Sequence, residues 1–245
     1  MFVPTWTTVS PPVTVGSPIE TAIDVWSIDL DAAPADLGDL LDEDERTRAN
    51  RFVVPVHSHR FAAAHGHLRI LLGTYLGCAP EAVAFQYGAW GKPTLRAPAG
   101  EGLAFNLAHS GGQALITVGR AEALGIDIEV MRPVADWLDI ATRTFAPGEI
   151  NALLSLPPHK QMDGFFACWT RKEAIIKFWG EGLSADLASF EVSLDPLAAA
   201  CLTKIERCGQ DVSDIKLYTF KTDLNTWAAL AAPANSISPR FWLLR

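Results

Sequence analysis

The chain has 245 residues, a formal net charge of −8 and an apolar fraction of 49%. This composition supports a folded protein with one large domain or two small ones, and it excludes a disordered chain. The acidic balance argues against wholesale binding to nucleic acid or to an anionic membrane. Residues 1–19 lack the basic and apolar regions of a secretory signal, and no window is apolar enough to span a membrane. We therefore expect a cytoplasmic protein.

The elements predicted for the first half begin after a leader, residues 1–19, whose four prolines and weak periodicity favour a loose arm. A helix is predicted at 42–52, where Asp42 and Glu45 have the spacing of a capping box. A stronger helix at 61–76 ends near Gly77. Strands are predicted at 23–30, 83–87, 103–107 and 114–118.

The second half repeats this order of elements. Helices are predicted from Pro147 to Leu156 and from Met162 to Trp179, the latter ending at Gly180. Strands are predicted at 125–129, 189–194, 215–221, 226–231 and 241–244. We therefore expect an α+β fold in which the leader is followed by two similar halves, residues 20–120 and 121–245, that meet at a central cleft.

Two segments about forty residues apart carry the side chains most suited to chemistry. Gly125-Ile126-Asp127-Ile128-Glu129 alternates like a strand, so Asp127 and Glu129 project from one face. In the helix predicted at 162–179, Glu173 and Lys177 lie one turn apart on one side. Three carboxylates beside a lysine suit a hard cation next to a phosphate.

Each pair also has a simpler interpretation. Asp127 and Glu129 could be the exposed face of a half-buried strand, and Glu173 with Lys177 could be a helix salt bridge in its favoured order. The setting shifts the balance, because the helix is crowded with aromatic and aliphatic residues and should be largely buried. Buried charges need partners, and a metal ion and a phosphate would serve.

Positive charge is gathered between Arg46 and Arg69, where five arginines and four histidines stand without an acidic residue. The stretch suits phosphates through bidentate arginine contacts, but it could equally be a solvated helix face and a loop. Its two His-x-His pairs, 57–59 and 65–67, have no cysteine or carboxylate nearby to complete a zinc site. The four cysteines lack metal-ligand spacing too, and we expect buried thiols in a reducing compartment.

Two loops present further basic groups. Gly91-Lys92-Pro93 is a turn that presents one lysine on a stiff corner. His109 stands where the strand Phe105-Asn-Leu-Ala-His-Ser-Gly reaches its loop. The adjacent Ser110 does not indicate a serine hydrolase, because neighbours on an extended chain point opposite ways and no Gly-x-Ser-x-Gly elbow occurs. A satisfied core or loop histidine is the simpler interpretation of His109.

In this order, the segments resemble the 4′-phosphopantetheinyl transferases, and the larger pseudo-dimeric, surfactin-synthetase-activating type fits better than the small trimeric type. The resemblance covers roughly residues 20–195 and rests on Gly-Lys-Pro, Phe-Asn-x-x-His-Ser-Gly, Gly-Ile-Asp-Ile-Glu and Trp-x-x-Lys-Glu-Ala-x-x-Lys. It implies two α+β halves related by a pseudo-twofold axis, and a monomer. It also implies transfer of phosphopantetheine from coenzyme A to a serine of an apo acyl or peptidyl carrier protein, releasing adenosine 3′,5′-bisphosphate.

The resemblance also implies roles for single residues. Mg²⁺, or Mn²⁺, would be held by Asp127, Glu129 and Glu173. Glu173 would take the proton from the carrier serine, and Lys177 would contact the pyrophosphate, so that Asp127, Glu173 and Lys177 are the catalytic residues. Lys172 would orient or neutralise the site. The nucleotide end of coenzyme A would be met by a basic set: Lys92, His109, Arg48, Arg51 and, as an addition, Arg60.

Two departures from the family pattern and two alternatives are open. Many relatives have serine where this chain has Ala108, which removes one ligand contact, and Ala146-Pro147 stands where Ser-Pro often begins a helix. A non-catalytic coenzyme A or nucleotide-binding module would bind without Mg²⁺ and transfer nothing. A metal-dependent hydrolase built on His57 and His59 would bind zinc and tolerate Glu173→Ala.

Overall fold

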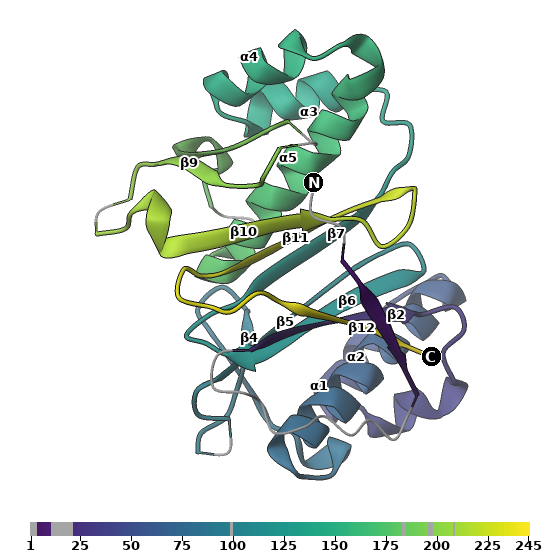
Figure 1. Cartoon of the computed structure of the whole chain (residues 1–245). Helices are drawn as coiled ribbons and strands as arrows, with labels where there is room; N and C mark the ends of the chain where they lie inside the picture. The colour runs from purple at the N-terminus through teal and green to yellow at the C-terminus, as the bar shows by residue number, and fades with distance from the viewer. Residues whose placement is uncertain (1–3, 11–21, 99, 183–184, 196–197, 208) are drawn as a thin grey trace. The chain divides into compact units, whose positions relative to one another are not determined.

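A computed structural model describes residues 4–10, 22–98, 100–182, 185–195, 198–207 and 209–245 (Figure 1). The chain divides into two compact units, each with its own sheet and its own long helix. Most of unit 1 is residues 89–92 and 123–236, and unit 2 is residues 5–88, 93–122 and 237–245. The mixed α+β class is confirmed, whereas the division near residue 120 and the central cleft stay predictions.

Unit 2 is built on a five-stranded sheet in the order β1-β12-β2-β6-β5. β12 runs parallel to both β1 and β2, whereas β6 runs antiparallel to β2 and β5. The inward side chains of these strands are buried together with the apolar face of the long helix α2. The strands are β1 (Trp6–Val9), β2 (Ile23–Asp29), β5 (Leu103–Ser110), β6 (Gln113–Arg120) and β12 (Arg240–Leu244).

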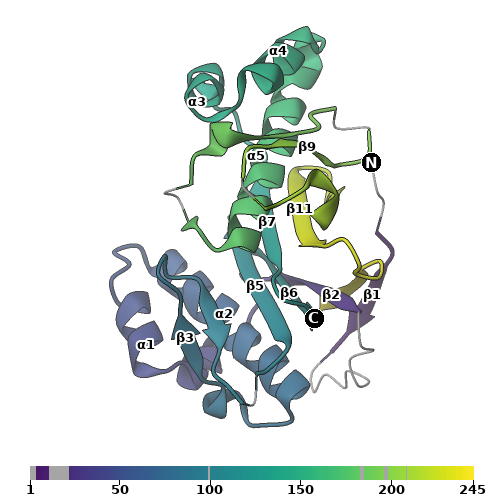
Figure 2. The same cartoon turned by 90° about the vertical axis from the view of Figure 1, so that its left-hand side faces the viewer.

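The helices of unit 2 pack on one another around α2 (Figure 2). The helix α1 begins as predicted, because Asp42 Oδ1 accepts from the Glu45 amide at 2.9 Å and Glu45 Oε2 accepts from the Asp42 amide at 3.1 Å. These elements are η1 (Ala35–Leu40), α1 (Glu43–Ala49), α2 (Pro55–Leu76) and η2 (Pro80–Ala82), with a short ladder of β3 (Phe85–Tyr87) and β4 (Pro93–Leu95).

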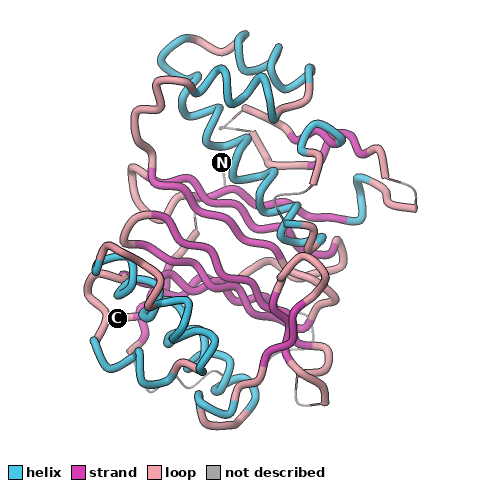
Figure 3. The backbone as a smooth tube through the Cα atoms, turned by 180° about the vertical axis from the view of Figure 1, so that it is seen from behind, coloured by secondary structure: helices cyan, strands magenta, loops and turns pink. Residues whose placement is uncertain are grey.

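Unit 1 packs the helix α5 (Pro158–Trp179) against an antiparallel sheet in the order β10-β11-β7 (Figure 3). Phenylalanine and isoleucine side chains of α5 form the centre of its buried core. The sheet contains β7 (Gly125–Val130), β10 (Ile215–Phe220) and β11 (Thr226–Pro233). Around it lie α3 (Trp137–Thr144), α4 (Pro147–Ser155), η4 (Leu187–Ser189), β8 (Phe190–Val192), β9 (Leu202–Ile205) and η5 (Val212–Asp214).

The structure differs from the predicted elements in several places. The leader contains β1, which pairs with β12 in register from Trp6 to Val9; its residues 11–19 lie outside the described part. Both long helices begin earlier than predicted, at Pro55 and Pro158, because proline is well suited to a first helical position even without an apolar residue behind it. The elements α3, β4 and β9 were not predicted, because each is shorter than the window over which periodicity is read.

The cysteine prediction was only partly right. Cys168 is buried in the core of unit 1, but Cys78 and Cys201 are exposed, and none of these three forms a disulfide. Cys208 lies outside the described residues. Among the described helices, none is both long enough and apolar enough to cross a membrane.

Candidate active site

The contact between β7 and α5 in unit 1 brings together three of the predicted catalytic side chains. Gly125 makes this contact close, because a Cβ at this position would collide with the Ala174 carbonyl oxygen and the Phe178 backbone. Along β7, Ile126 and Ile128 enter the core, and the alternate position Asp127 is also buried, at 6% exposure. Glu173 on α5 is buried to 8%. The strand is therefore not an exposed polar face at Asp127.

The central interaction is an ion pair between Lys177 Nζ and Asp127 Oδ1, 2.6 Å apart. Lys177 therefore makes this pair across the two elements in place of the i,i+4 salt bridge with Glu173 that was the simpler interpretation. Asp127 Oδ2 and Glu173 Oε1 are both buried and accept no hydrogen bond from the described residues. A buried carboxylate oxygen without a donor is costly, so two such atoms in one place indicate a binding function.

The electrostatics of the site are those of crowded carboxylates. Burial raises the pKa of Asp127 to about 7, and although Lys177 opposes this, Glu173 and Glu129 add to the increase. Burial also raises the pKa of Glu173, again against Lys177 and with Glu129. Glu129 itself is a quarter exposed, and Arg132 approaches it at 3.8 Å. A strongly perturbed set of carboxylates is typical of functional sites.

The donor chemistry of this set fits a magnesium ion. Among the described residues, no three His, Cys, Asp or Glu side chains already stand close enough together to hold a metal ion. Mg²⁺ does not need such a cage, because it keeps several waters and takes one or two carboxylates together with substrate phosphates. The unpartnered oxygens of Asp127 and Glu173 are two hard donors of this kind, with Glu129 at the rim.

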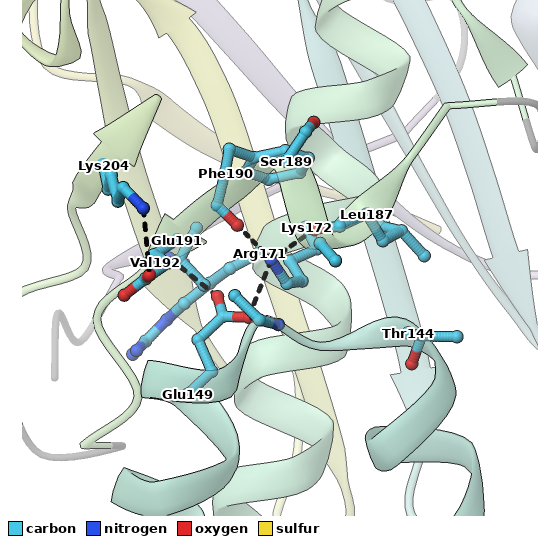
Figure 4. Close-up of polar contacts among 12 residues, drawn as sticks. Thr144, Glu149, Arg171, Lys172, Leu187, Ser189, Phe190, Glu191, Val192 and Lys204 are labelled. Atoms are coloured by element: carbon cyan, nitrogen blue, oxygen red, sulfur yellow. Dashed lines mark hydrogen bonds and ion pairs between the residues drawn. The ribbon is translucent and has the colours of Figure 1, made fainter. Parts of the chain in front are cut away.

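Lys172 lies apart from these carboxylates, contrary to its predicted place in the site. Its ammonium is buried on the opposite side, 2.8 Å from Glu149 Oε2, and donates to the carbonyls of Leu187 at 2.8 Å and Phe190 at 2.6 Å (Figure 4). It also lies 4.2 Å from the centre of the Phe190 ring. Successive helix residues point about 100° apart, and here Lys172 contacts Glu149 while Glu173 interacts electrostatically with Asp127 on β7.

Glu149 is the residue that sequence reasoning missed. It also accepts from the amides of Ala146 and Val192, each at 2.8 Å, and so joins α4, α5 and β8 around Lys172. Burial raises its pKa. The signal that could have found it is the three-residue spacing from Ala146, which is that of the glutamate in a capping box.

Lys92 also has an interior position in unit 1. Its ammonium donates to the carbonyl oxygens of Leu124 at 3.0 Å, of Phe178 at 3.2 Å and of Lys177. Burial lowers its pKa to about 8. Contact with a phosphate, as predicted, would require these hydrogen bonds to be given up.

The basic stretch of unit 2 does not form one phosphate-binding face. Arg69 is buried and binds Glu45 at 2.6 Å and Asp42 at 2.5 Å. Arg60 makes a bidentate pair with Asp31, at 2.7 Å for both bonds. The exposed residues of this stretch are Arg46, Arg48, Arg51 and His57, and His109 is exposed at the end of β5.

The His-x-His pairs are separated in the same way. His65 Nδ1 lies 2.9 Å from Glu45 Oε1, and His67 Nδ1 lies 2.8 Å from the Ala63 carbonyl. The second pair is thus engaged in helix packing, while His57 is exposed. These contacts give the hydrolase alternative no support.

Comparison with known proteins matches this chain to one family. A family described as the 4'-phosphopantetheinyl transferase superfamily matches residues 123–230. The 4'-phosphopantetheinyl transferase HetI of Nostoc sp. is 39% identical over 242 residues, which cover 97% of this chain and 98% of HetI. The 4'-phosphopantetheinyl transferase of Bacillus subtilis is 35% identical over 151 residues, covering 62% of this chain and 65% of that protein.

A solved structure, the Thermotoga maritima holo-[acyl-carrier-protein] synthase (AcpS), covers 45% of this chain and 62% of its own, with 19% identity and a TM-score of 0.35. That likeness is too low to bear on the fold. The similarity to HetI, in contrast, extends over nearly the full length of both proteins. The chain therefore belongs to the 4′-phosphopantetheinyl transferases, as its four motifs predicted.

Proposed function

We propose that this transferase performs its chemistry in unit 1, with Asp127, Glu173 and Lys177 as the catalytic residues. As a member of its family, the enzyme moves the 4′-phosphopantetheine arm of coenzyme A onto carrier proteins. The observation that carries the site is the pair of buried, unpartnered oxygens on Asp127 and Glu173 beside the Lys177 ammonium. Neither a helix salt bridge nor a polar strand face accounts for those two atoms.

Asp127 and Glu173, with Glu129 at the rim, are the residues that would hold Mg²⁺, or Mn²⁺ with the same oxygen ligands. When bound, the cation neutralises charge that develops on the pyrophosphate as its bond breaks. Three carboxylates otherwise repel a polyanion such as coenzyme A. A cation-free site is therefore expected to bind coenzyme A weakly.

The residues of unit 1 act on the proton and the phosphate. The Glu173 carboxylate accepts the proton of the carrier serine, whose Oγ attacks the phosphorus attached to the pantetheine arm. The bond from that phosphorus to the bridging oxygen breaks, and adenosine 3′,5′-bisphosphate leaves with the electron pair. Burial makes Glu173 more basic than a surface glutamate, which favours this transfer. Lys177 lies beside the phosphates and offsets their negative charge.

The nucleotide end of coenzyme A is proposed to contact exposed basic groups of unit 2. Arg48, Arg51 and His109 are the members of the predicted set that lie on the surface of this unit. Arg60 is the weaker addition, because both of its bonds already go to Asp31. Lys92 and Lys172 are left out, because their ammonium groups are used inside unit 1.

Further expectations belong with this proposal. The carrier is an apo acyl or peptidyl carrier protein, and the enzyme works as a cytoplasmic monomer that binds neither nucleic acid nor membrane. The boundary near residue 120 and the two similar halves about a cleft are retained, except that β1 of the leader and β12 of the second half lie in the sheet of unit 2. The similarity of the two halves is supported by their long helices. Each unit has a helix of 22 residues that starts at a proline and ends at a glycine in the left-handed conformation, Gly77 or Gly180.

The test is intact-protein mass spectrometry of an apo carrier protein after incubation with coenzyme A and Mg²⁺, with EDTA in a parallel sample. We expect a mass gain of one phosphopantetheine that EDTA abolishes. Glu173→Gln should lower the transfer rate at least 100-fold, a loss within the range for removing a general base. Its binding of coenzyme A, measured by calorimetry with Ca²⁺, should also weaken, because Glu173 is one of the residues that would hold the cation.

The matched control is Glu206→Gln, a surface carboxylate of the same unit that pairs with Lys204. This variant should transfer at the wild-type rate. Coenzyme A binding without transfer to any of several carriers would establish the binding-module alternative instead. Full activity of Glu173→Gln would remove Glu173 from the catalytic set while leaving the family assignment in place.

A further inference from the structure

Lys92, like Lys172, is a motif residue whose observed contacts differ in kind from its predicted role. Its side chain reaches from the turn at residues 89–92 to the end of α5 and the start of β7. A lysine ammonium has three hydrogens to donate. Three backbone carbonyls receive them, those of Leu124, Lys177 and Phe178, so the donor capacity of Lys92 is fully used.

Two of these carbonyls belong to the last turn of α5, where a helix has no partners of its own for its carbonyl groups. The Ile176 carbonyl is satisfied by the Gly180 amide at 2.8 Å and the Glu181 amide at 3.4 Å. The next two carbonyls are those that Lys92 binds. A cation at this end is also favoured by the helix dipole. Lys92 thus completes the C-terminal cap of α5 from a distant segment.

The third carbonyl ties that cap to the neighbouring strand. Leu124 directly precedes β7, so one ammonium links the end of α5 to the beginning of the strand that carries Asp127. The aliphatic part of Lys92 fills the space over Gly180, where an added Cβ would lie 3.1 Å from Lys92 Cδ. The cap at α5 therefore has a polar and an apolar component from one side chain.

The position of this link matters because it lies next to the ion pair between Lys177 and Asp127. The backbone carbonyl of Lys177 accepts a hydrogen bond from Lys92, and the ammonium of Lys177 pairs with Asp127. Lys177 is therefore held at both its backbone and its side chain, between α5 and β7. A shift of about 1 Å between catalytic groups can lower a rate 100-fold. A loosened last turn of α5 would move Lys177 relative to Asp127.

We propose that Lys92 is a positioning residue for phosphopantetheinyl transfer, which fixes the last turn of α5 against the start of β7 and so sets Lys177 against Asp127. This inference rests on the function proposed above for those two residues. It differs from a phosphate-binding role, because Lys92 then acts through backbone carbonyls and makes no contact with coenzyme A.

The experiment compares two donors, coenzyme A and 3′-dephospho-coenzyme A, in the full-length enzyme carrying Lys92→Met. We expect kcat to fall about 100-fold with both donors. The ratio of their kcat/KM values should stay within twofold of wild type. Binding of adenosine 3′,5′-bisphosphate, measured by calorimetry, should also stay within threefold. A ratio that collapses toward one, or a tenfold weaker binding with kcat intact, would establish a phosphate contact and overturn the proposal.

Hydrogen exchange supplies a readout that does not need catalysis. In Lys92→Met, the Gly180 and Glu181 amides should exchange at least tenfold faster, while amides in the first turns of α5 keep their protection. Unchanged exchange at these two amides would also overturn the proposal. If wild type transfers nothing, the proposed function fails, but this measurement still decides whether Lys92 holds the helix end.

Two further variants show whether a loss of activity in Lys92→Met comes from a loss of folding. Lys216→Met is the matched control, because Lys216 is an exposed lysine of the same unit that donates to one carbonyl, that of Ser236, at 3.0 Å. It should leave kcat and exchange unchanged. Lys92→Gln keeps two donors and should recover part of kcat relative to Lys92→Met at equal circular dichroism. No recovery, with the fold intact, would count against the proposal.

Discussion

Removing the Lys177 ammonium gives the sharpest test of the carboxylate cluster. In Lys177→Met, Asp127 would lose the one side-chain donor, 2.6 Å away, that it has among the described residues, while Glu173 and Glu129 still raise its pKa. Breaking a buried ion pair by removing one partner costs about 3–5 kcal/mol. Because the Lys177 side chain is 29% exposed, we expect the lower end, about 3 kcal/mol. For a chain of this size that corresponds to a fall in Tm of roughly 6–12 °C.

The loss should depend on pH in a definite direction. The pKa of Asp127 in the folded protein is about 7, above its ordinary value of 3.8, and it rises further without Lys177. The folded state then binds more protons than the unfolded state between these values, so stability falls as pH rises. The fall in Tm of Lys177→Met relative to wild type should be largest above pH 7. It should shrink toward pH 5, where Asp127 takes up a proton.

The assay is thermal unfolding followed by circular dichroism at pH 5.5, 7 and 8.5, with and without MgCl₂. Mg²⁺ should raise the Tm of Lys177→Met more than that of wild type, because a cation then replaces the missing positive charge. The double variant Asp127→Asn/Lys177→Met removes both charges and should recover part of the loss. Lys204→Met, at an exposed pair with Glu206, is the control and should shift Tm by less than 2 °C.

Two results would refute this reasoning. A Tm within 2 °C of wild type for Lys177→Met would mean that the ion pair does not offset the buried charge of Asp127. An equal effect of Mg²⁺ on the Tm of wild type and variant would mean that the cation does not act at these carboxylates. Either result would leave the family assignment untouched, because that rests on the similarity to HetI.

Three further predictions concern stability. Glu149→Gln leaves the buried ammonium of Lys172 without its counter-charge, and the free energy of unfolding in urea should fall by about 3–5 kcal/mol. The double variant Glu149→Gln/Lys172→Met should recover part of this loss, and equal losses in both variants would contradict the prediction. Burial lowers the pKa of His67 below its ordinary 6.5, so unit 2 should lose stability as pH falls below about 6.5. In proteolysis assays, His67→Gln should reduce this dependence of stability on pH. Gly125→Ala forces a Cβ onto the Ala174 carbonyl and should cost about 1–3 kcal/mol by calorimetry; a neutral change would show that α5 can shift.

Local sequence was a good guide where the interaction is local. The capping box of α1 joins Asp42 to a residue three positions away, and the strand around Asp127 has only to alternate. The motif order likewise required no tertiary information, because it lists residue types at intervals along the chain. These features were sufficient for the family and for the catalytic set, whose roles stay proposals.

Long-range partners could not be predicted in this way. Lys92 and Lys172 are both lysines of a motif, and nothing local distinguishes a phosphate ligand from a buried cap. Lys92 finds carbonyls at Leu124, 32 residues away, and at Lys177, 85 residues away, whereas Lys172 finds Glu149. A buried charged group pairs with the polar group that tertiary packing places within about 3 Å of it. Its role therefore depends on contacts between elements that are distant in sequence.

Composition and alternation indicated an α+β fold, because these properties follow from periodicity along the chain. The resemblance of its motifs to a known family gave the transferase activity and the prediction of Asp127, Glu173 and Lys177 as reactive groups. The direction of each charged side chain was specified by the packing of α5. One helix turns Glu173 toward β7 and Lys172 toward Glu149, and its rotation is set by the apolar core of unit 1 rather than by either charge.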